Sequence, residues 1–181
     1  MNRLFRRRNV MPPELALALE LGPAERVLAW SSLVGGGAAA ATIMGLRILT
    51  PRGKVISRTW VGVDHAAWDQ DAAMLVIWWV DSRQATPLEI LDDVGRLPEV
   101  IRERVQASVV LTSSVVLPGG KVGRVALRRD AKGQLSAQSL LPPGVRADAP
   151  DVAPALQRAM DALWSEAGEH GLNTTPPPSF I

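Results

Sequence analysis

The chain lacks cysteine altogether and has only two histidines, His65 and His170, among its 181 residues. Without cysteine, the sequence excludes a disulfide framework, thiolate metal sites and cysteine nucleophiles. Two histidines also remove most imidazole-based metal binding and acid–base catalysis. Tyrosine is absent as well and phenylalanine occurs twice, whereas tryptophan occurs six times. Tryptophan is therefore the aromatic residue on which any aromatic core or binding surface depends.

The overall composition is that of an ordinary globular protein. Hydrophobic residues make up 47% of the chain and charged residues 21%, which is the usual balance for a soluble domain. A chain of this length predicts one domain, with room for a small extension. A body of this size buries about 70% of its unfolded surface, so a hydrophobic core forms without disulfides or metals.

Positive charge is concentrated in two segments rather than spread over the chain. Residues 1–8 contain four arginines, and residues 121–132 contain five bases and one acid, so each segment carries +4. Because the whole chain carries +2, the remainder carries −6. This pattern does not fit a uniformly basic nucleic-acid-binding domain, and we expect no specific nucleic-acid partner.

The longest uncharged stretch, residues 27–46, is long enough in principle to cross a bilayer. However, Gly35-Gly36-Gly37 lies between its two apolar halves, and Arg47 follows directly. A glycine triplet between apolar runs favours a hairpin of two buried strands. The basic start of the chain has no apolar stretch behind it, unlike a secretory signal. We therefore expect a cytoplasmic protein without a transmembrane segment.

Short apolar runs separated by turn-forming residues indicate β-strands in the first part of the chain. A short helix, 14–21, precedes them behind Pro12-Pro13. The run AMLVIWWV at 73–80 is typical of a strand covered on both faces. The expected strands are 26–33, 38–44, 55–63, 73–80 and 85–91, and 45–50 either continues the second or forms another.

Residues 97–108 have apolar residues at helical spacing and predict an amphipathic helix. A β-meander is expected after it, followed by a linker at 142–150. Asp151 is then placed to cap a helix over 152–168. The tail 172–181 and residues 1–11 are expected to be disordered. The meander strands are 109–117, 122–129 and 134–141, and the apolar stripe of the last helix is Val152, Leu156, Met160, Leu163, Trp164 and Ala167.

Several short motifs follow one another over residues 24–109, and their order is similar to that of a known family. They are Glu25-Arg26-Val27-Leu28, Ala41-Thr42, Gly45-Leu46-Arg47-Ile48, Trp60-Val61-Gly62-Val63-Asp64 and Ala67-Trp68-Asp69. This part of the chain resembles bacterial pleckstrin-homology-like (PH-like) domain proteins of actinobacteria. Frequent alanine and arginine with only three lysines is consistent with a GC-rich genome.

The resemblance implies an α+β fold in which an antiparallel, strongly bent sheet, or partly open barrel, is closed by helix 97–108. It also implies binding rather than catalysis. The expected PH-like domain is 12–109, and 110–171 adds the β-meander and C-terminal helix, packed on the first sheet or continuous with it. The first hairpin reads VGGGAAAA where phosphoinositide-binding members place basic residues, so lipid-headgroup binding is not expected there.

Candidates for catalysis and metal binding are few. Asp64 and His65 suggest a small hydrolase, but adjacent strand residues point to opposite faces and no GxSxG motif is present. Asp69-Gln70-Asp71 and Asp92-Asp93 fit turns better than a metal site. Gly119-Gly120-Lys121 lacks the spacing of a phosphate-binding loop. We therefore predict no catalytic residues, no metal and no cofactor, and interpret His65 as a surface residue.

Candidate binding residues fall into three groups. Trp78 and Trp79 are consecutive and must point to opposite faces of a strand, so Trp79, or Trp60, is a candidate contact for a ligand. The basic hairpin 121–132 is either a solvated surface or a site for an anionic partner. Arg6, Arg7 and Arg8 contribute ~1 kcal/mol each at an anionic membrane surface, which gives weak attachment. The bases of the hairpin group are Arg124, Arg128, Arg129 and Lys132.

The sequence as a whole predicts a non-catalytic PH-like interaction module that binds a protein partner or self-associates into a homo-oligomer. One alternative is a binder of anionic ligands or membrane surfaces through the arginine-rich N-terminus and the hairpin 121–132. The other is a small hydrolase around Asp64 and His65. The sequence does not identify the partner or the oligomeric state.

Overall fold

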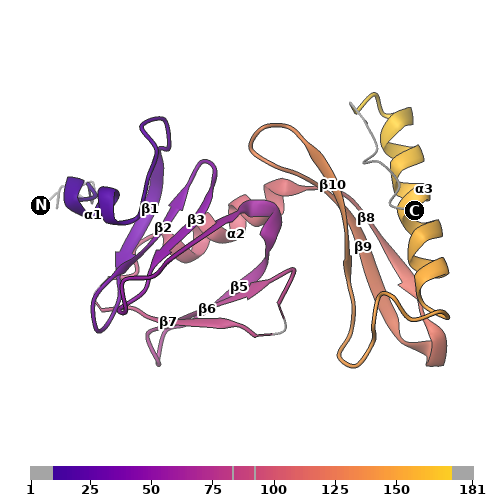
Figure 1. Cartoon of the computed structure of the whole chain (residues 1–181), viewed down its shortest axis with the longest axis horizontal. Helices are drawn as coiled ribbons and strands as arrows, with labels where there is room; N and C mark the ends of the chain where they lie inside the picture. The colour runs from indigo at the N-terminus through magenta and orange to yellow at the C-terminus, as the bar shows by residue number, and fades with distance from the viewer. Residues whose placement is uncertain (1–9, 83, 92, 173–181) are drawn as a thin grey trace, which may run out of the picture. The chain divides into compact units, whose positions relative to one another are not determined.

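A computed structural model describes residues 10–82, 84–91 and 93–172 of the chain (Figure 1). The chain divides into two compact units, residues 1–105 and 106–181. The division falls within the last turn of helix α2, Leu97–Ser108. The sequence predicts its boundary slightly later, between 109 and 110. Arg6, Arg7 and Arg8 lie outside the described residues.

The first unit contains two antiparallel sheets after a short helix, α1 (Pro13–Ala18). Strands β1 to β4 form the larger sheet in sequence order, and β5 to β7 form the smaller one. Leu33, directly after β1, forms an isolated bridge with Ile90, directly after β7, and this bridge connects the two sheets. The two sheets do not close into a barrel over the described residues. The strands are β1 Val27–Ser32, β2 Ala38–Thr42, β3 Gly45–Leu49, β4 Val55–Thr59, β5 Val63–Asp69, β6 Met74–Trp79 and β7 Thr86–Glu89.

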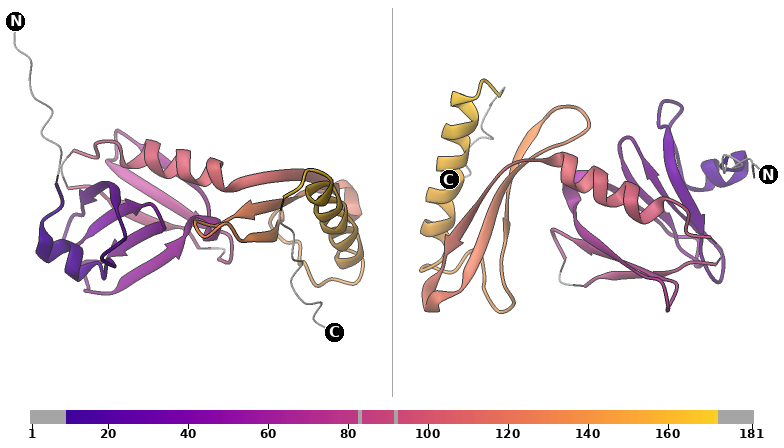
Figure 2. Two further views of the ribbon diagram at one scale, coloured as in Figure 1. Left: turned by 90° about the horizontal axis from the view of Figure 1, so that it is seen from above. Right: turned by 180° about the vertical axis from the view of Figure 1, so that it is seen from behind.

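Helix α2 lies against both sheets of the first unit (Figure 2). Its predicted apolar stripe is confirmed, because Leu97, Ile101 and Val105 are all buried in one core. Leu46 and Ile48 of β3 join this core, as do Leu75 and Ile77 of β6. Burial of aliphatic side chains from both sheets against one helix is the main force that holds this unit together.

The glycine triplet forms a hairpin, as predicted. Gly35, Gly36 and Gly37 all have positive φ and connect β1 to β2. A Cβ on Gly37 would lie only 2.1 Å from the carbonyl oxygen of Leu49, so this position also needs glycine for close backbone approach. No helix among the described residues is long and apolar enough to cross a membrane.

Two strand predictions are wrong in detail. The predicted strand 55–63 is broken at a 3-10 turn, η1 (Trp60–Gly62), after which β5 begins. The indole N–H of Trp60 donates to the carbonyl of Thr42 at 3.0 Å, so Trp60 turns into the core and ends β4. Strand 73–80 is buried on only one face: Leu75 and Ile77 are buried, whereas the opposite face is half-buried.

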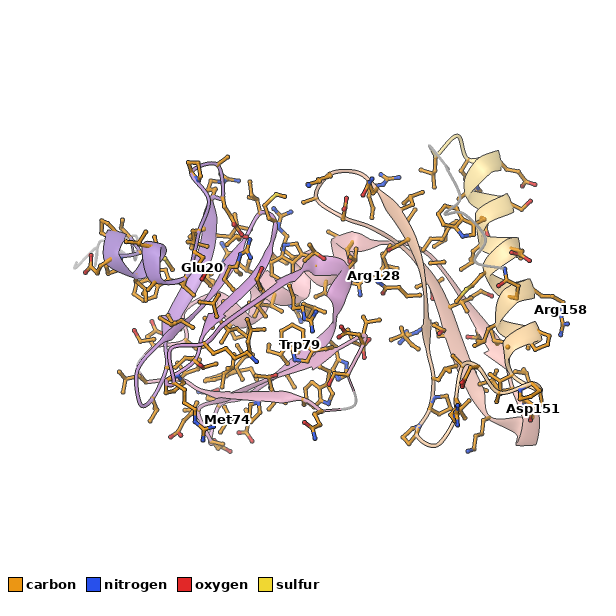
Figure 3. All side chains as sticks on the ribbon, viewed as in Figure 1. Glu20, Met74, Trp79, Arg128, Asp151 and Arg158 are labelled. Carbon is orange, nitrogen blue, oxygen red and sulfur yellow. The ribbon has the colours of Figure 1, made fainter. Side chains whose placement is uncertain are left out.

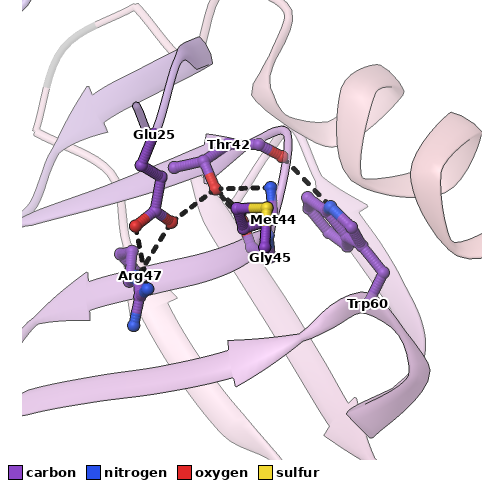
Figure 4. A network of polar contacts seen from close by, with 6 residues as sticks. All are labelled: Glu25, Thr42, Met44, Gly45, Arg47 and Trp60. Carbon is purple, nitrogen blue, oxygen red and sulfur yellow. Dashed lines mark hydrogen bonds and ion pairs between the residues drawn. The ribbon is translucent and has the colours of Figure 1, made fainter. Parts of the chain in front are cut away.

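A partly buried ion pair fixes the turn between β2 and β3 (Figure 4). Both carboxylate oxygens of Glu25 accept hydrogen bonds from Arg47, at 3.0 and 2.8 Å, and one also accepts from the hydroxyl of Thr42 at 2.7 Å. The Thr42 oxygen in turn accepts the N–H groups of Met44 and Gly45. Burial raises the pKa of Glu25, but the bonds from Arg47 and Thr42 outweigh it, and the pKa lies below its ordinary value.

The second unit is a three-stranded antiparallel meander in the order β10-β9-β8, with helix α3 on one face (Figures 1 and 2). The predicted meander and C-terminal helix are confirmed. The elements are β8 Val109–Val116, η2 Pro118–Gly120, β9 Val122–Arg129, β10 Leu135–Leu140 and α3 Ala153–Glu169. Its core is separate from that of the first unit and consists of Val115, Leu117, Val125, Leu127, Val152, Leu156, Leu163 and Ala167.

Asp151 does not cap α3, contrary to the prediction. Val152 occupies the N-cap position, and no side chain bonds to the exposed N–H groups there. The chain turns before the helix, because Ala149 already accepts the N–H groups of Val152 and Ala153. Pro154 in the first turn removes one donor that would otherwise need a cap. Asp151 is consequently exposed just before the helix (Figure 3).

Candidate functional site

Trp79 is the predicted binding residue that borders an opening in the first unit. Its side chain lies between the elements of that unit and is 8% exposed (Figure 3). The indole N–H donates to the hydroxyl of Thr86 at 2.8 Å, which ties the end of β6 to the start of β7. The guanidinium carbon of Arg58 lies 6.0 Å from the ring centroid, within range of a cation–π contact. Trp79 is therefore held in place from both sides.

An open groove of about 420 Å³ runs past Trp79 between β4 and the segment that leads into β7. On one side it is bordered by two cations, Lys54 and Arg58. Arg58 also forms an exposed ion pair with Asp81 at 3.3 Å, which contributes little to stability in water. The lining is Lys54, Val55, Ile56, Ser57 and Arg58 with Trp79, Ser82, Gln84, Ala85 and Thr86.

The edge of β4 that borders this groove is unpaired. Over the described residues β4 pairs only with β3. The N–H of Thr50 donates to the carbonyl of Lys54, and bonded pairs alternate along an antiparallel ladder. Ile56 and Arg58 therefore bond to β3, whereas Val55 and Ser57 direct their N–H and C=O groups outward. Thr59 directs only its N–H outward, because its carbonyl begins the 3-10 turn η1. An edge of this kind can accept another strand.

Trp60, the second predicted aromatic contact, is a core residue. It is buried, and its N–H bonds to the carbonyl of Thr42 (Figure 4). Trp78, by contrast, is half-buried and stacks on His65, with ring centroids 4.4 Å apart and planes 8° apart. Of Trp60, Trp78 and Trp79, only Trp79 lines the groove.

Asp64 and His65 lie closer than strand geometry predicts. Asp64 Oδ2 is 3.0 Å from His65 Nδ1, although neighbouring strand residues normally point apart. The register of β5 with β6 shifts between Val63 and His65, and this bulge brings the two side chains together. The His65 side chain is 56% exposed. Within the described ranges no hydroxyl hydrogen-bonds to its other ring nitrogen, as a catalytic triad would require.

The basic hairpin does not present all its predicted bases on the surface. Arg128 is only 3% exposed and donates from Nε and Nη2 to the hydroxyl of Ser108, at 2.9 and 2.5 Å. Arg124, Arg129 and Lys132 are exposed. Arg124 shares a strand face with Arg128, whereas Arg129 points to the other face. The exposed charge is therefore divided between the two faces and the turn.

The acidic residues that the sequence assigns to turns stabilise turns in the structure. Asp69 Oδ1 accepts the N–H groups of Asp71 and Ala72, which stabilises the turn between β5 and β6. Asp93 accepts the N–H of Gly95 in the same way, and Asp92 lies outside the described residues. In the part of the chain that the structure describes, no three histidine or acidic side chains gather as a metal site would require.

The groove residues other than Trp79 have no sequence signature. Lys54 and Ser57 belong to a short, ordinary hairpin, and their relation to Trp79 arises only in the folded unit. Comparison of the chain with protein-family models, curated proteins and solved structures finds no match in any of the three.

Proposed function

We propose that the chain is a non-catalytic interaction module whose PH-like first unit binds an extended segment of a protein partner along β4. The four-stranded and three-stranded antiparallel sheets with helix α2 support this proposal, since the PH-like resemblance implies a bent sheet closed by one helix. The unpaired edge of β4 beside an open groove is the observation that carries it.

Strand addition explains how such a site recognises a peptide. The outward N–H and C=O groups of Val55 and Ser57, with the N–H of Thr59, supply main-chain hydrogen bonds that do not depend on the peptide sequence. Specificity then comes from the groove lining. Lys54 and Arg58 favour acidic side chains, and Trp79 offers an apolar edge. The preferred partner is an extended, acidic peptide segment.

The proposal is tested by selecting binders to the intact chain from a random peptide display library. We expect enrichment of acidic, β-prone sequences. Binding is then compared in Ser57→Pro and Ser57→Ala, because proline removes only the outward N–H of β4 whereas alanine keeps it. Loss of binding in the proline variant alone, with an unchanged circular dichroism spectrum, supports the proposal. Equal binding by both variants, or no enriched peptide, refutes it.

The exposed bases Arg124, Arg129 and Lys132 support a second candidate, binding to an anionic surface. Three bases give weak, salt-sensitive attachment. Co-sedimentation with vesicles containing phosphatidylserine, measured from low to physiological salt, tests this candidate. Binding at low salt that Arg124→Gln and Arg129→Gln together abolish would support it. No binding at low salt would remove it.

A further inference from the structure

Strand β8 forms an unprotected edge of the second unit. In the order β10-β9-β8 it pairs only with β9 over the described residues. Its sequence, VVLTSSVV, contains no charged residue and no proline, which are the residues that usually protect an edge strand. Five of its eight residues are exposed: Val109, Thr112, Ser113, Ser114 and Val116. The one irregularity lies at its start, between Val109 and Leu111.

The outward backbone groups of β8 belong to alternate residues. The N–H of Leu117 donates to the carbonyl of Lys121 at 2.7 Å and closes the hairpin with β9. Because bonded pairs alternate from there, Val115 and Ser113 bond to β9. Thr112 and Ser114 therefore direct their N–H and C=O groups away from the sheet. These groups are the ones that an added strand would meet.

The sequence of β8 is complementary to itself when it runs antiparallel about Ser113. In that register Thr112 lies opposite Ser114, Leu111 opposite Val115, and Val110 opposite Val116. Hydroxyl groups then face hydroxyl groups, and aliphatic groups face aliphatic groups, which are favourable cross-strand pairs. The same register brings together the outward backbone groups of Thr112 and Ser114.

We propose that the second unit self-associates, with two copies pairing their β8 strands antiparallel about Ser113. Two three-stranded sheets then form one continuous sheet with isologous two-fold symmetry. This inference adds a second interaction surface to the proposed function and does not depend on peptide binding at β4. A second copy fits this edge better than a charged partner, because β8 carries no charge to select one.

The position of α3 agrees with this arrangement. Helix α3 packs mainly on β8 and β9, near the free edge and on one face of the sheet (Figure 2). Opposed residues of paired strands share a face, so both copies place α3 on the same side. Neighbouring strands lie about 4.7–4.9 Å apart. Because each α3 lies over β8 and β9 of its own copy, the two helix axes are about two strand spacings, or about 10 Å, from each other. This is a normal distance for packed helices.

Because the chain contains no cysteine, one introduced thiol reports the register directly. Ser113 faces its own copy in a non-hydrogen-bonded pair, where the Cα atoms are about 4.5 Å apart and a disulfide fits. We expect Ser113→Cys to form a covalent dimer on mild oxidation, seen by non-reducing electrophoresis. Ser114→Cys and the exposed α3 variant Ser165→Cys are matched controls and stay largely uncrosslinked. Equal crosslinking of all three variants would refute the register.

Sedimentation equilibrium provides the second measurement. The intact chain is expected at twice its mass of 19.4 kDa, and Ser113→Lys at the mass of one chain, because two like charges then meet at the two-fold axis. Ser165→Lys stays dimeric, and circular dichroism checks that each variant is folded. A monomeric wild-type chain, or a Ser113→Lys variant that remains dimeric, overturns the proposal. Peptide binding by the Ser113→Lys variant, measured separately, shows whether the β4 site stays intact when β8 pairing is lost.

Discussion

The indole N–H of Trp79 donates a 2.8 Å hydrogen bond to the hydroxyl of Thr86, the first residue of the next strand. This bond holds Trp79, at the end of β6, to the start of β7. Trp79 thus combines a core position with an edge that faces the opening. The hydrogen bond therefore joins two residues that both line the groove.

Replacing Thr86 with valine keeps the shape of the side chain and removes the acceptor. The indole N–H of Trp79 is then left without its partner, and such a loss costs about 1–3 kcal/mol. Urea unfolding should therefore show a lower free energy of unfolding for Thr86→Val. Thr59→Val on the exposed part of β4 serves as the control, with little expected change. Equal stability of the two variants would show that the bond contributes nothing.

The ion pair between Glu25 and Arg47 makes stability depend on pH. The pKa of Glu25 in the folded chain lies below its ordinary value of 4.5, so the folded state binds fewer protons than the unfolded state. This contribution is complete above about pH 5 and is lost as the pH falls through the lowered pKa. Glu25→Gln should be less stable than wild type at neutral pH, and the difference should shrink as the solution is acidified below the ordinary pKa. Parallel stability curves would contradict this account.

A methyl group at Gly45 should disrupt the pairing of β3 with β4. Its Cβ would lie 2.0 Å from the carbonyl oxygen of Arg58, and backbone cannot give way as a flexible side chain can. We expect Gly45→Ala to lower the free energy of unfolding by about 1–3 kcal/mol, the usual range for overpacking. At Gly62 the nearest atoms to an added Cβ are 3.9 Å away, so Gly62→Ala should be much milder. Equal effects would argue against the close approach at Gly45.

The two cores predict a local response to a cavity in the second unit. Leu163 is buried among residues of β8, β9 and α3 and shares no cluster with the first unit. Leu163→Ala should cost about 2–5 kcal/mol, and hydrogen exchange should accelerate most within the second unit, from residue 106 onward. Ile101→Ala is the matched control, because it opens a cavity in the other core and should accelerate exchange mainly in the first unit. Uniform acceleration along the chain in both variants would contradict separate cores.

Patterns within single elements predicted much of the fold. The spacing of Leu97, Ile101 and Val105 predicted α2 with its bounds, and Gly35-Gly36-Gly37 predicted the first hairpin. Both depend on local periodicity or turn chemistry, which the sequence displays directly. Strand β5 was missed because its alanines and polar residues carry little strand preference.

The candidate site depended on contacts between distant segments. The groove needs β4 and the residues before β7 to face each other across Trp79, and no local pattern encodes that arrangement. The bulge that joins Asp64 to His65 and the bond that buries Arg128 against Ser108 are likewise products of strand register. The strand pattern identified Trp79 as a candidate, but it did not identify the cations and the serine of β4 and its turn that line the groove.

Addition of an extended peptide to the free edge of β4 can be followed residue by residue through amide hydrogen exchange measured by NMR. Adding the tightest peptide from the display selection should slow exchange at Val55, Ser57 and Thr59, whose N–H groups point outward. Exchange at Ile56 and Arg58 should change little, because their N–H groups already bond to β3. Protection that appears elsewhere, or equally at all five residues, would show that the peptide does not add to β4.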